Sequence, residues 1–321
     1  LSGLVDGLRL SELLPGAGNL FHTEVQGEEI TWVIANVHFR QGEGEFWADS
    51  ARWHQKANRV VLIGKVKIRY PDYRLSADSV RYDAKSKEGW AYSRIRYEDL
   101  KEKTVLLGER GKYEREKKYL FIDQKPEMWL LPSASDTAQP ETTFVWAKKL
   151  EFFGGEEKGI GTDSVRIRRG KVFAYSQKAV FSRKEEKLVL TEKPRGGDDK
   201  SEVTAERLTL YFKGNRIDRL TAEKKARAAY REAVDTTGAG TTLSELAADS
   251  IIFHFEGEAP TSMRALGQAY IYYKQADGKI KNHASGDSVH LSLKDRKVET
   301  VAVRGGGQGT YYAFPENRSG G

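Results

Sequence analysis

Apolar and polar residues alternate along most of this 321-residue chain, and one short pattern recurs eight times between residues 48 and 291. Each copy has a small residue, usually followed by an acid. An apolar residue comes two positions after the acid, and a second, usually aromatic, comes two positions further. The copies start 29 to 43 residues apart, at Ala48, Ala77, Gly108, Ala147, Ser176, Ala205, Ala248 and Gly286. Spacing of this kind predicts a repeat architecture.

Each period of the repeat predicts one β-hairpin. The apolar residues within a copy are two positions apart, which places them on one face of a strand and fits a helix poorly. A polar, turn-forming stretch follows, such as residues 54–58, and then a second alternating run, such as residues 60–68. Because an isolated hairpin is only marginally stable in water, the hairpins are expected to stack around a shared apolar interior. The sequence therefore predicts an all-β, elongated, antiparallel body.

The chain contains no stretch typical of a long flexible linker, so residues 1–321 are interpreted as a single continuous scaffold. Polar segments at residues 131–142, 193–201 and 235–242 are predicted to be surface connections, and the scaffold could bend near 131–142. Residues 222–234 have a helix-forming composition. Their place in the repeat and the even spacing of their apolar residues favour a strand instead.

Composition narrows the classes of protein. Charged residues make up 31% and hydrophobic residues 39%, which suits a thin two-sheet body with one solvated face per strand. The chain has no cysteine, which excludes disulfides, thiol catalysis and thiolate metal sites. No run of eighteen apolar residues and no basic-then-apolar leader is present, so we expect no membrane-spanning segment and a signal peptide, if one existed, already removed. The net charge of +7 favours an anionic partner, although solubility explains it equally well.

The sequence predicts no enzyme, cofactor or metal site. The six histidines are dispersed, and no HExxH, GxSxG or GxxxxGK motif occurs. The recurring acids could bind calcium, but each stands alone, so we expect them to accept backbone hydrogens at a strand bend. These acids are Asp49, Asp78, Glu109, Glu206, Asp249 and Asp287. The glycines at 305–309 are expected to form a turn or bulge and not an anion site. Alternating arginines such as Arg166 and Arg168 fit a two-faced strand, so no nucleic-acid partner is predicted.

Four segments carry a resemblance to a known family. Residues 36–42 (NVHFRQG), 46–53 (FWADSARW), 60–68 (VVLIGKVKI) and 75–78 (LSAD) resemble the OstA-like repeat of LptA-type lipopolysaccharide-transport proteins. The pattern is clearest over residues 31–125, returns at 201–230, and closes with residues 285–288 and 305–311. Ala35 and Lys65 depart from it, standing where the family often has Gly and Asn.

The resemblance implies a semi-open β-jellyroll, or β-taco, whose apolar groove carries acyl chains of lipopolysaccharide or a related anionic glycolipid across the periplasm. It also implies partners of similar fold at the inner and outer membranes. Burying acyl chains stabilises a complex by about 0.8 kcal/mol per methylene. The unpaired edges of such a sheet further predict end-to-end self-association.

By family position, the groove is expected to be lined by residues on one face of the strands: Phe46, Ala48, Leu62, Val66, Ile68, Tyr73, Leu75, Ala77, Val203, Ala205, Leu246 and Ala248. The opposite set, such as Ala51 with Trp53 or Val80 with Tyr82, is equally apolar. Either set could face the groove if a bulge follows the acid.

Two other functions compete with a lipid carrier. A structural or adhesin-like repeat protein would fill its interior with its own side chains. A carbohydrate-processing β-helix would need paired carboxylates on an exposed face and shorter repeats, and the sequence shows neither.

Overall fold

The computed structural model describes residues 18–25, 27–132, 141–213, 216–233, 241–257, 259–275, 280–294 and 297–313. These residues form antiparallel strands and no helix, which confirms the all-β, jellyroll-like fold class. The backbone divides into two compact units, residues 1–170 and 171–321. The predicted connections at 131–142 and 235–242 lie largely outside the described residues, so the single continuous scaffold stays a prediction.

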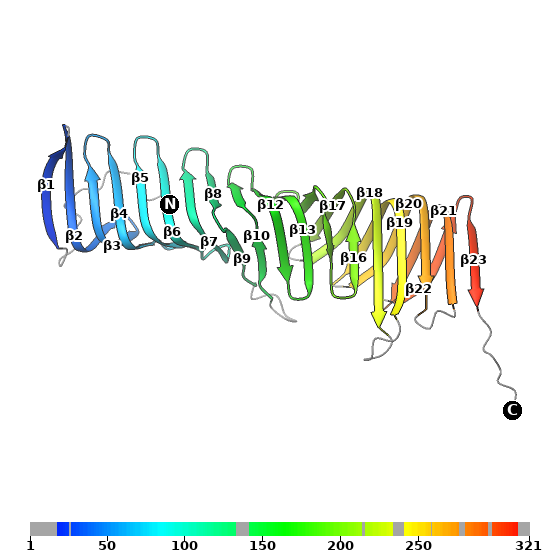
Figure 1. The fold of residues 1–321 in the computed structure, drawn as a ribbon. Helices are drawn as coiled ribbons and strands as arrows, with labels where there is room; N and C mark the ends of the chain where they lie inside the picture. Colours follow the sequence, from blue (N-terminus) through cyan, green and yellow to red (C-terminus); the bar gives the residue numbers. More distant parts are fainter. Residues whose placement is uncertain are drawn as a thin grey trace, which may run out of the picture. The chain divides into compact units, whose positions relative to one another are not determined.

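Unit 1 consists of successive antiparallel hairpins (Figure 1). Its strands are β1 (Asn19–Val25), β2 (Glu28–Gln41), β3 (Gly44–His54), β4 (Arg59–Arg69), β5 (Tyr73–Asp83), β6 (Glu88–Asp99), β7 (Thr104–Glu114), β8 (Tyr119–Asp123), β9 (Glu127–Leu130), β10 (Thr143–Trp146), β11 (Lys149–Phe153) and β12 (Lys158–Arg169). Strands β1 to β7 each pair with the next strand along the chain.

Unit 2 repeats the hairpin arrangement with some longer strands. They are β13 (Val172–Ser182), β14 (Lys187–Thr191), β15 (Arg195–Gly197), β16 (Ser201–Thr204), β17 (Arg207–Lys213), β18 (Arg216–Ala233), β19 (Thr241–Glu256), β20 (Ala259–Lys274), β21 (Ile280–Lys294), β22 (Lys297–Arg304) and β23 (Gln308–Ala313). Strand β18 contains most of residues 222–234, which confirms the prediction of a strand there. Ala222 and Ala226 are fully buried in it, so tertiary packing overrides the helix-forming composition.

The long strands bend in the middle at a β-bulge. In the β2–β3 pair, Ile34 lies opposite Ser50 and Val37 opposite Ala48, so Ala35 and Asn36 together face one residue of β3. Both have positive φ, 68° and 51°. Two residues opposing one is the defining feature of a bulge, and it turns the strand sharply.

The same pair of positive-φ residues recurs through both units. The pairs are Ala35–Asn36, Gly64–Lys65, Ser93–Arg94, Gln124–Lys125, Asp163–Ser164, Glu192–Lys193, Lys224–Lys225, Gly267–Gln268 and Gly305–Gly306. The eight copies of the small–acid pattern lie on the intervening strands, at the level of these pairs. The repeat is therefore the sequence signature of the bend, and the last pair confirms the expected bulge at 305–309. Ala35 and Lys65 occupy positions that favour Gly or Asn because of their positive φ.

The bend also decides which side chains face the interior. In β3 the buried small residues are Ala48 before the bend and Ala51 after it, three positions apart, so the inward-facing set changes parity. In β4 the buried residues are Leu62 and Val66, four positions apart. Both sets that the sequence left open therefore point inward.

In unit 1 the bend separates two half-sheets that share one core. Half-sheet A comprises residues 37–41, 44–48, 66–69, 73–77, 95–99 and 104–108, with their continuations in β9, β10 and β12. Half-sheet B comprises residues 28–34, 50–54, 59–63, 79–83, 88–92 and 110–114, continued in β8, β11 and β12. Buried side chains of both belong to one cluster, so the half-sheets face each other.

The side of unit 1 opposite the bend, here called the mouth, lies between two rows of turns. Backbone hydrogen bonds connect turns within each row: Leu100 N–H donates to the Asp72 carbonyl at 2.8 Å, and Ala84 N–H donates to the Asn58 carbonyl at 3.0 Å. Among the described residues, no backbone hydrogen bond joins the row of half-sheet A to that of half-sheet B. The described main chain therefore makes no hydrogen bond across the mouth.

Candidate functional site

The residues predicted to line the groove face the interior of their unit. Eight lie in unit 1 and are at most 8% exposed: Phe46, Ala48, Leu62, Val66, Ile68, Tyr73, Leu75 and Ala77. In unit 2, Val203, Leu246 and Ala248 are buried and Ala205 is partly buried. The unit 1 residues other than Tyr73 also belong to the shared cluster. The structure thus brings them together, and their contact with a lipid stays a prediction.

The interior of unit 1 changes character from the bend to the mouth. Near the bend it is lined by small and aliphatic side chains such as Ala48, Val66 and Ala77. At the mouth side of half-sheet A, aromatic rings contact one another in a row, with centroids 4.7 to 6.0 Å apart. The row consists of Phe39, Phe46, Tyr70, Tyr73 and Tyr97.

Half-sheet B carries a second set of aromatic residues toward the mouth. These are the last residues of the repeat pattern, which end up nearest the turns: Trp53, Tyr82 and Tyr113. Tyr82 is 4% exposed, and Trp53 packs against the shared cluster. The sequence did not assign them to the mouth, although the aromatic residue at the end of six of the eight copies was the available signal. Tyr and Trp suit a boundary where one end of the ring is apolar and the other is wet.

Burial at the mouth keeps the tyrosine hydroxyls protonated. Desolvation raises the pKa of Tyr70 to about 12. The pKa of Tyr97 is raised further, first by desolvation and then by the charges of Asp99 and of Tyr113 on the opposite half-sheet.

The recurring acids support the bends. The Glu109 carboxylate accepts a hydrogen bond from the backbone N–H of Arg94 at 3.1 Å, as the sequence predicted for these acids. Asp78 instead accepts hydrogen bonds from the Arg94 side chain at 2.8 and 3.0 Å. In unit 2, Glu206 pairs with Lys225 at 3.0 Å.

The copy at Ala147 shows why the acid can be missing. There the charges are exchanged, since Lys148 lies between β10 and β11 and Asp163 lies on the bulged strand β12, 3.8 Å apart. An ion pair can therefore join the motif position to the bulged strand with its two charges in either order.

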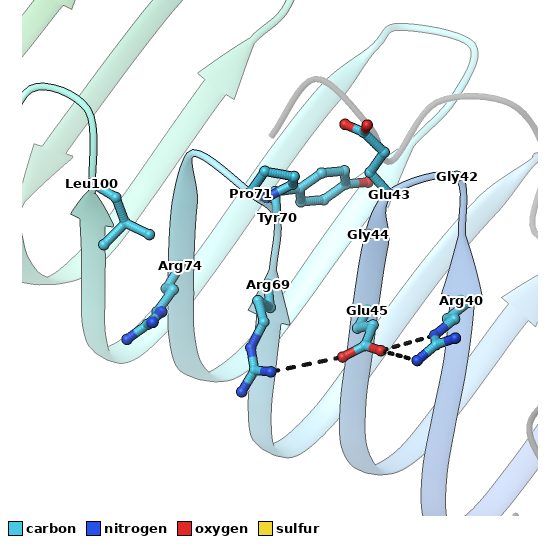
Figure 2. Close-up of a pocket in the computed structure, with 10 residues that line it drawn as sticks. All are labelled: Arg40, Gly42, Glu43, Gly44, Glu45, Arg69, Tyr70, Pro71, Arg74 and Leu100. Carbon is cyan, nitrogen blue, oxygen red and sulfur yellow. Dashed lines mark hydrogen bonds and ion pairs between the residues drawn. The ribbon is translucent and has the colours of Figure 1, made fainter.

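A cavity of about 510 Å³ lies at the rim of half-sheet A, at the turns that follow β2, β4 and β6 (Figure 2). Three arginines line it, Arg40, Arg69 and Arg74, with side chains about 60% exposed. Tyr70 and Leu100 supply apolar surface. Arg69 and Arg74 meet across the β4–β5 turn, and Arg40 joins them at the cavity through strand pairing.

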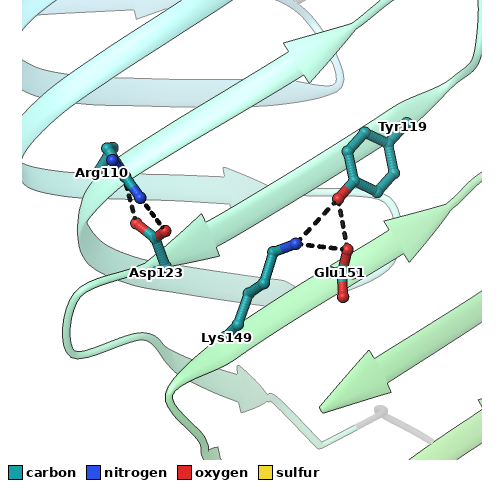
Figure 3. Close-up of polar contacts among 5 residues, drawn as sticks. All are labelled: Arg110, Tyr119, Asp123, Lys149 and Glu151. Carbon is teal, nitrogen blue, oxygen red and sulfur yellow. Dashed lines mark hydrogen bonds and ion pairs between the residues drawn. The ribbon is translucent and has the colours of Figure 1, made fainter. Parts of the chain in front are cut away.

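Polar side chains on the outer face of half-sheet B pair with one another (Figure 3). Arg110 donates two hydrogen bonds to Asp123, at 2.9 and 2.5 Å. Lys149 donates to Glu151 at 2.7 Å, and the Tyr119 hydroxyl donates to the same carboxylate at 2.5 Å. Burial opposes ionisation of Glu151, but these hydrogen bonds outweigh it and lower its pKa. These cross-strand pairs stabilise the sheet.

Within the described ranges, no three His, Asp or Glu side chains are grouped so that they could hold a metal ion. The described part of the chain likewise has no helix of the length and apolarity needed to cross a bilayer.

No family model and no curated protein matches the sequence. A solved structure that does match is LptH of Pseudomonas aeruginosa, described as the LptA-homologous periplasmic component of the lipopolysaccharide transport device. The similar region covers 34% of this chain and 75% of LptH, with 14% sequence identity and a TM-score of 0.31. The likeness is confined to part of the chain, so we argue function from the residues themselves.

Proposed function

We propose that this protein binds the acyl chains of lipopolysaccharide or a related anionic glycolipid between its half-sheets and passes the lipid across the periplasm. The observation that carries this proposal is the arrangement of the unit 1 interior. Aliphatic residues lie near the bend, aromatic residues with polar atoms lie at the mouth, and arginines lie at the rim. A phosphorylated amphiphile has its groups in the same order, from apolar tails to charged phosphates.

Lipid entry requires the half-sheets to separate at the mouth. The interior side chains are almost fully buried against one another, with Phe46 at 0% and Leu62 at 1% exposure. A lipid would replace these contacts with its own, at a similar apolar gain per area. The absence of backbone hydrogen bonds between the two described rows of turns is consistent with such opening.

Site-specific photo-crosslinking tests the proposal. A crosslinker at Phe46 or Leu75, both directed inward, is expected to form adducts with the glycolipid in cells. Trp47 and Ser76 are the adjacent outward positions on the same strands and serve as matched controls, expected to give none. Native mass spectrometry of the gently purified chain reports bound lipid independently. Adducts at the outward positions only, or at none of the four, would contradict the proposal.

The second candidate is a structural repeat protein with a self-filled core, and the dense burial of the interior favours it. The two candidates differ in one measurement. Delipidated protein incubated with glycolipid vesicles gains lipid mass if it is a carrier, whereas a self-filled core gains none.

We also propose that the chain joins end to end with itself or with transport components of similar fold. In unit 1, β1 has β2 as its only described partner strand, and Leu20, Phe21 and Val25 are about 50% exposed. Light scattering is expected to show association that rises with concentration and weakens in Leu20→Glu/Phe21→Glu. Identical masses for both proteins at every concentration would contradict this.

A further inference from the structure

The rim cavity contains two arginines from directly paired strand positions. Arg69 on β4 and Arg74 on β5 are cross-strand partners in the ladder. Like charges in this position destabilise a sheet. Their presence at the rim therefore calls for a compensating anion.

Two glutamates compensate this pair only in part: Glu45 lies directly opposite Arg69 in the ladder, and Glu98 lies directly opposite Arg74. Glu45 is held by Arg40, which donates to Oε1 at 2.8 and 2.6 Å, and its Oε2 is 3.9 Å from Arg69. Glu98 is held by Arg96 at 2.6 Å, and its other oxygen is 4.0 Å from Arg74. Neither Arg69 nor Arg74 has a carboxylate within hydrogen-bond distance in the described part of the chain.

The other residues that line the cavity indicate the chemistry of the rest of the ligand. The Glu43 carboxylate lies beyond the Tyr70 ring, away from the guanidinium groups (Figure 2). Pro71 and Leu100 present apolar surface, and Leu100 is 42% exposed. The Tyr70 hydroxyl is buried and has no hydrogen-bond partner among the described residues. Tyr70 also stacks on Tyr73 at 4.8 Å, so the cavity adjoins the aromatic row of the mouth.

We propose that this cavity binds a phosphate group of an anionic amphiphile, with Arg69 and Arg74 as its ligands. A guanidinium donates two parallel hydrogen bonds to phosphate oxygens, so two arginines at paired positions can share one phosphate. The aromatic row then directs the apolar part toward the interior. This inference rests on the proposed function and assigns the residues that select a phosphorylated lipid over a neutral one.

Binding of two lipids by the full chain tests the assignment. The probes are a diphosphorylated acylated disaccharide and the same molecule after enzymatic dephosphorylation. The variant Arg69→Gln/Arg74→Gln is expected to bind the phosphorylated form at least 10-fold more weakly and the dephosphorylated form within twofold of the native protein. A control, Arg81→Gln/Arg227→Gln, removes two exposed arginines elsewhere and should change neither affinity by more than twofold.

Thermal unfolding without ligand separates binding from folding. Because the double substitution removes a like-charge contact, its unfolding temperature is expected to equal or exceed that of the native chain. An equal loss of affinity for both lipids, or for variant and control alike, overturns the assignment of the phosphate site and leaves the lipid carrier standing. If inorganic phosphate binds in an Arg69- and Arg74-dependent manner while neither lipid binds, the anion site stands and the proposed function fails.

Discussion

The two units share one bend and fill their interiors differently. In unit 1 the residue that follows a positive-φ pair is β-branched at four of the five pairs, as at Val37, Val66 and Ile95, and Pro126 is the exception. At the same position in unit 2, Ala226 and Ala269 are small and essentially inaccessible to solvent. The bulge geometry is thus independent of the side chain that it turns inward. The difference shows that the backbone conformation at the bulge produces the repeat. The volume of the inward-facing side chains determines how the interior is filled.

The units also differ toward their turns. In unit 1 three of the four copies of the pattern end in Trp53, Tyr82 and Tyr113, which combine an apolar ring with a polar atom, and the fourth ends in Phe152. In unit 2 the corresponding residues include Leu210, Phe253 and Leu291, which have none. Unit 1 is therefore the better match for the boundary between acyl chains and a polar head.

The largest expected effect is loss of a large interior side chain from unit 1. Phe46→Ala removes a fully buried ring that contacts Phe39 and Tyr70. We expect the free energy of unfolding to fall by about 3–5 kcal/mol in urea denaturation. The matched control is Phe21→Ala, at a ring 51% exposed, which should change it by less than about 0.5 kcal/mol. Equal losses would show that the unit 1 interior is not packed as described.

Enlarging a small residue in unit 2 should come next. Ala269→Leu adds volume at a position with 0% exposure and is expected to cost about 1–3 kcal/mol. The equivalent position in unit 1 already holds Val66, so Val66→Leu adds a single methylene and should cost less. A larger loss for Val66→Leu would reverse the comparison between the interiors.

The bends should respond alike in both units. Gly64 and Gly267 have φ of 79° and 77°, and a Cβ at either would overlap the carboxylate of Asp49 or Asp249. We expect Gly64→Ala and Gly267→Ala each to lower stability by about 1–2 kcal/mol. Gly42→Ala, at φ 55° with open space around it, isolates the backbone contribution, and Gly155→Ala is the neutral reference. Different losses at the two bends would mean that the bulges are not equivalent.

The smallest effect concerns the unit 1 mouth at alkaline pH. Because burial raises the pKa of Tyr70 to about 12, the folded state retains a proton that the unfolded state loses near pH 10. Stability is then full below pH 10 and falls as the pH rises toward 12. Tyr70→Phe should reduce that fall in unfolding temperature and leave stability at pH 8 unchanged or higher. A pH profile identical to that of the native chain would contradict this assignment.

The sequence predicted the strands well because their information is local. Alternation, turn residues and the position of each copy were enough to identify the hairpins and to assign β18 as a strand. The resemblance to the OstA-like repeat also led to the prediction that Phe46, Leu62 and Leu75 face inward. The sequence could not show whether the set of Ala48 or the set of Ala51 faces the interior. One extra residue on the neighbouring strand changes which side chains point inward.

What the sequence by itself determined is the repeat, the all-β fold and the apolar character of the inward faces, since each follows from residues a few positions apart. Only the tertiary structure decided that both sets of apolar residues share one interior, that tyrosines meet at the mouth, and that Arg69 stands opposite Arg74. The physical reason is that these relations depend on strand register and on the bulges. Both are fixed by hydrogen bonds between strands and not by any single stretch of chain.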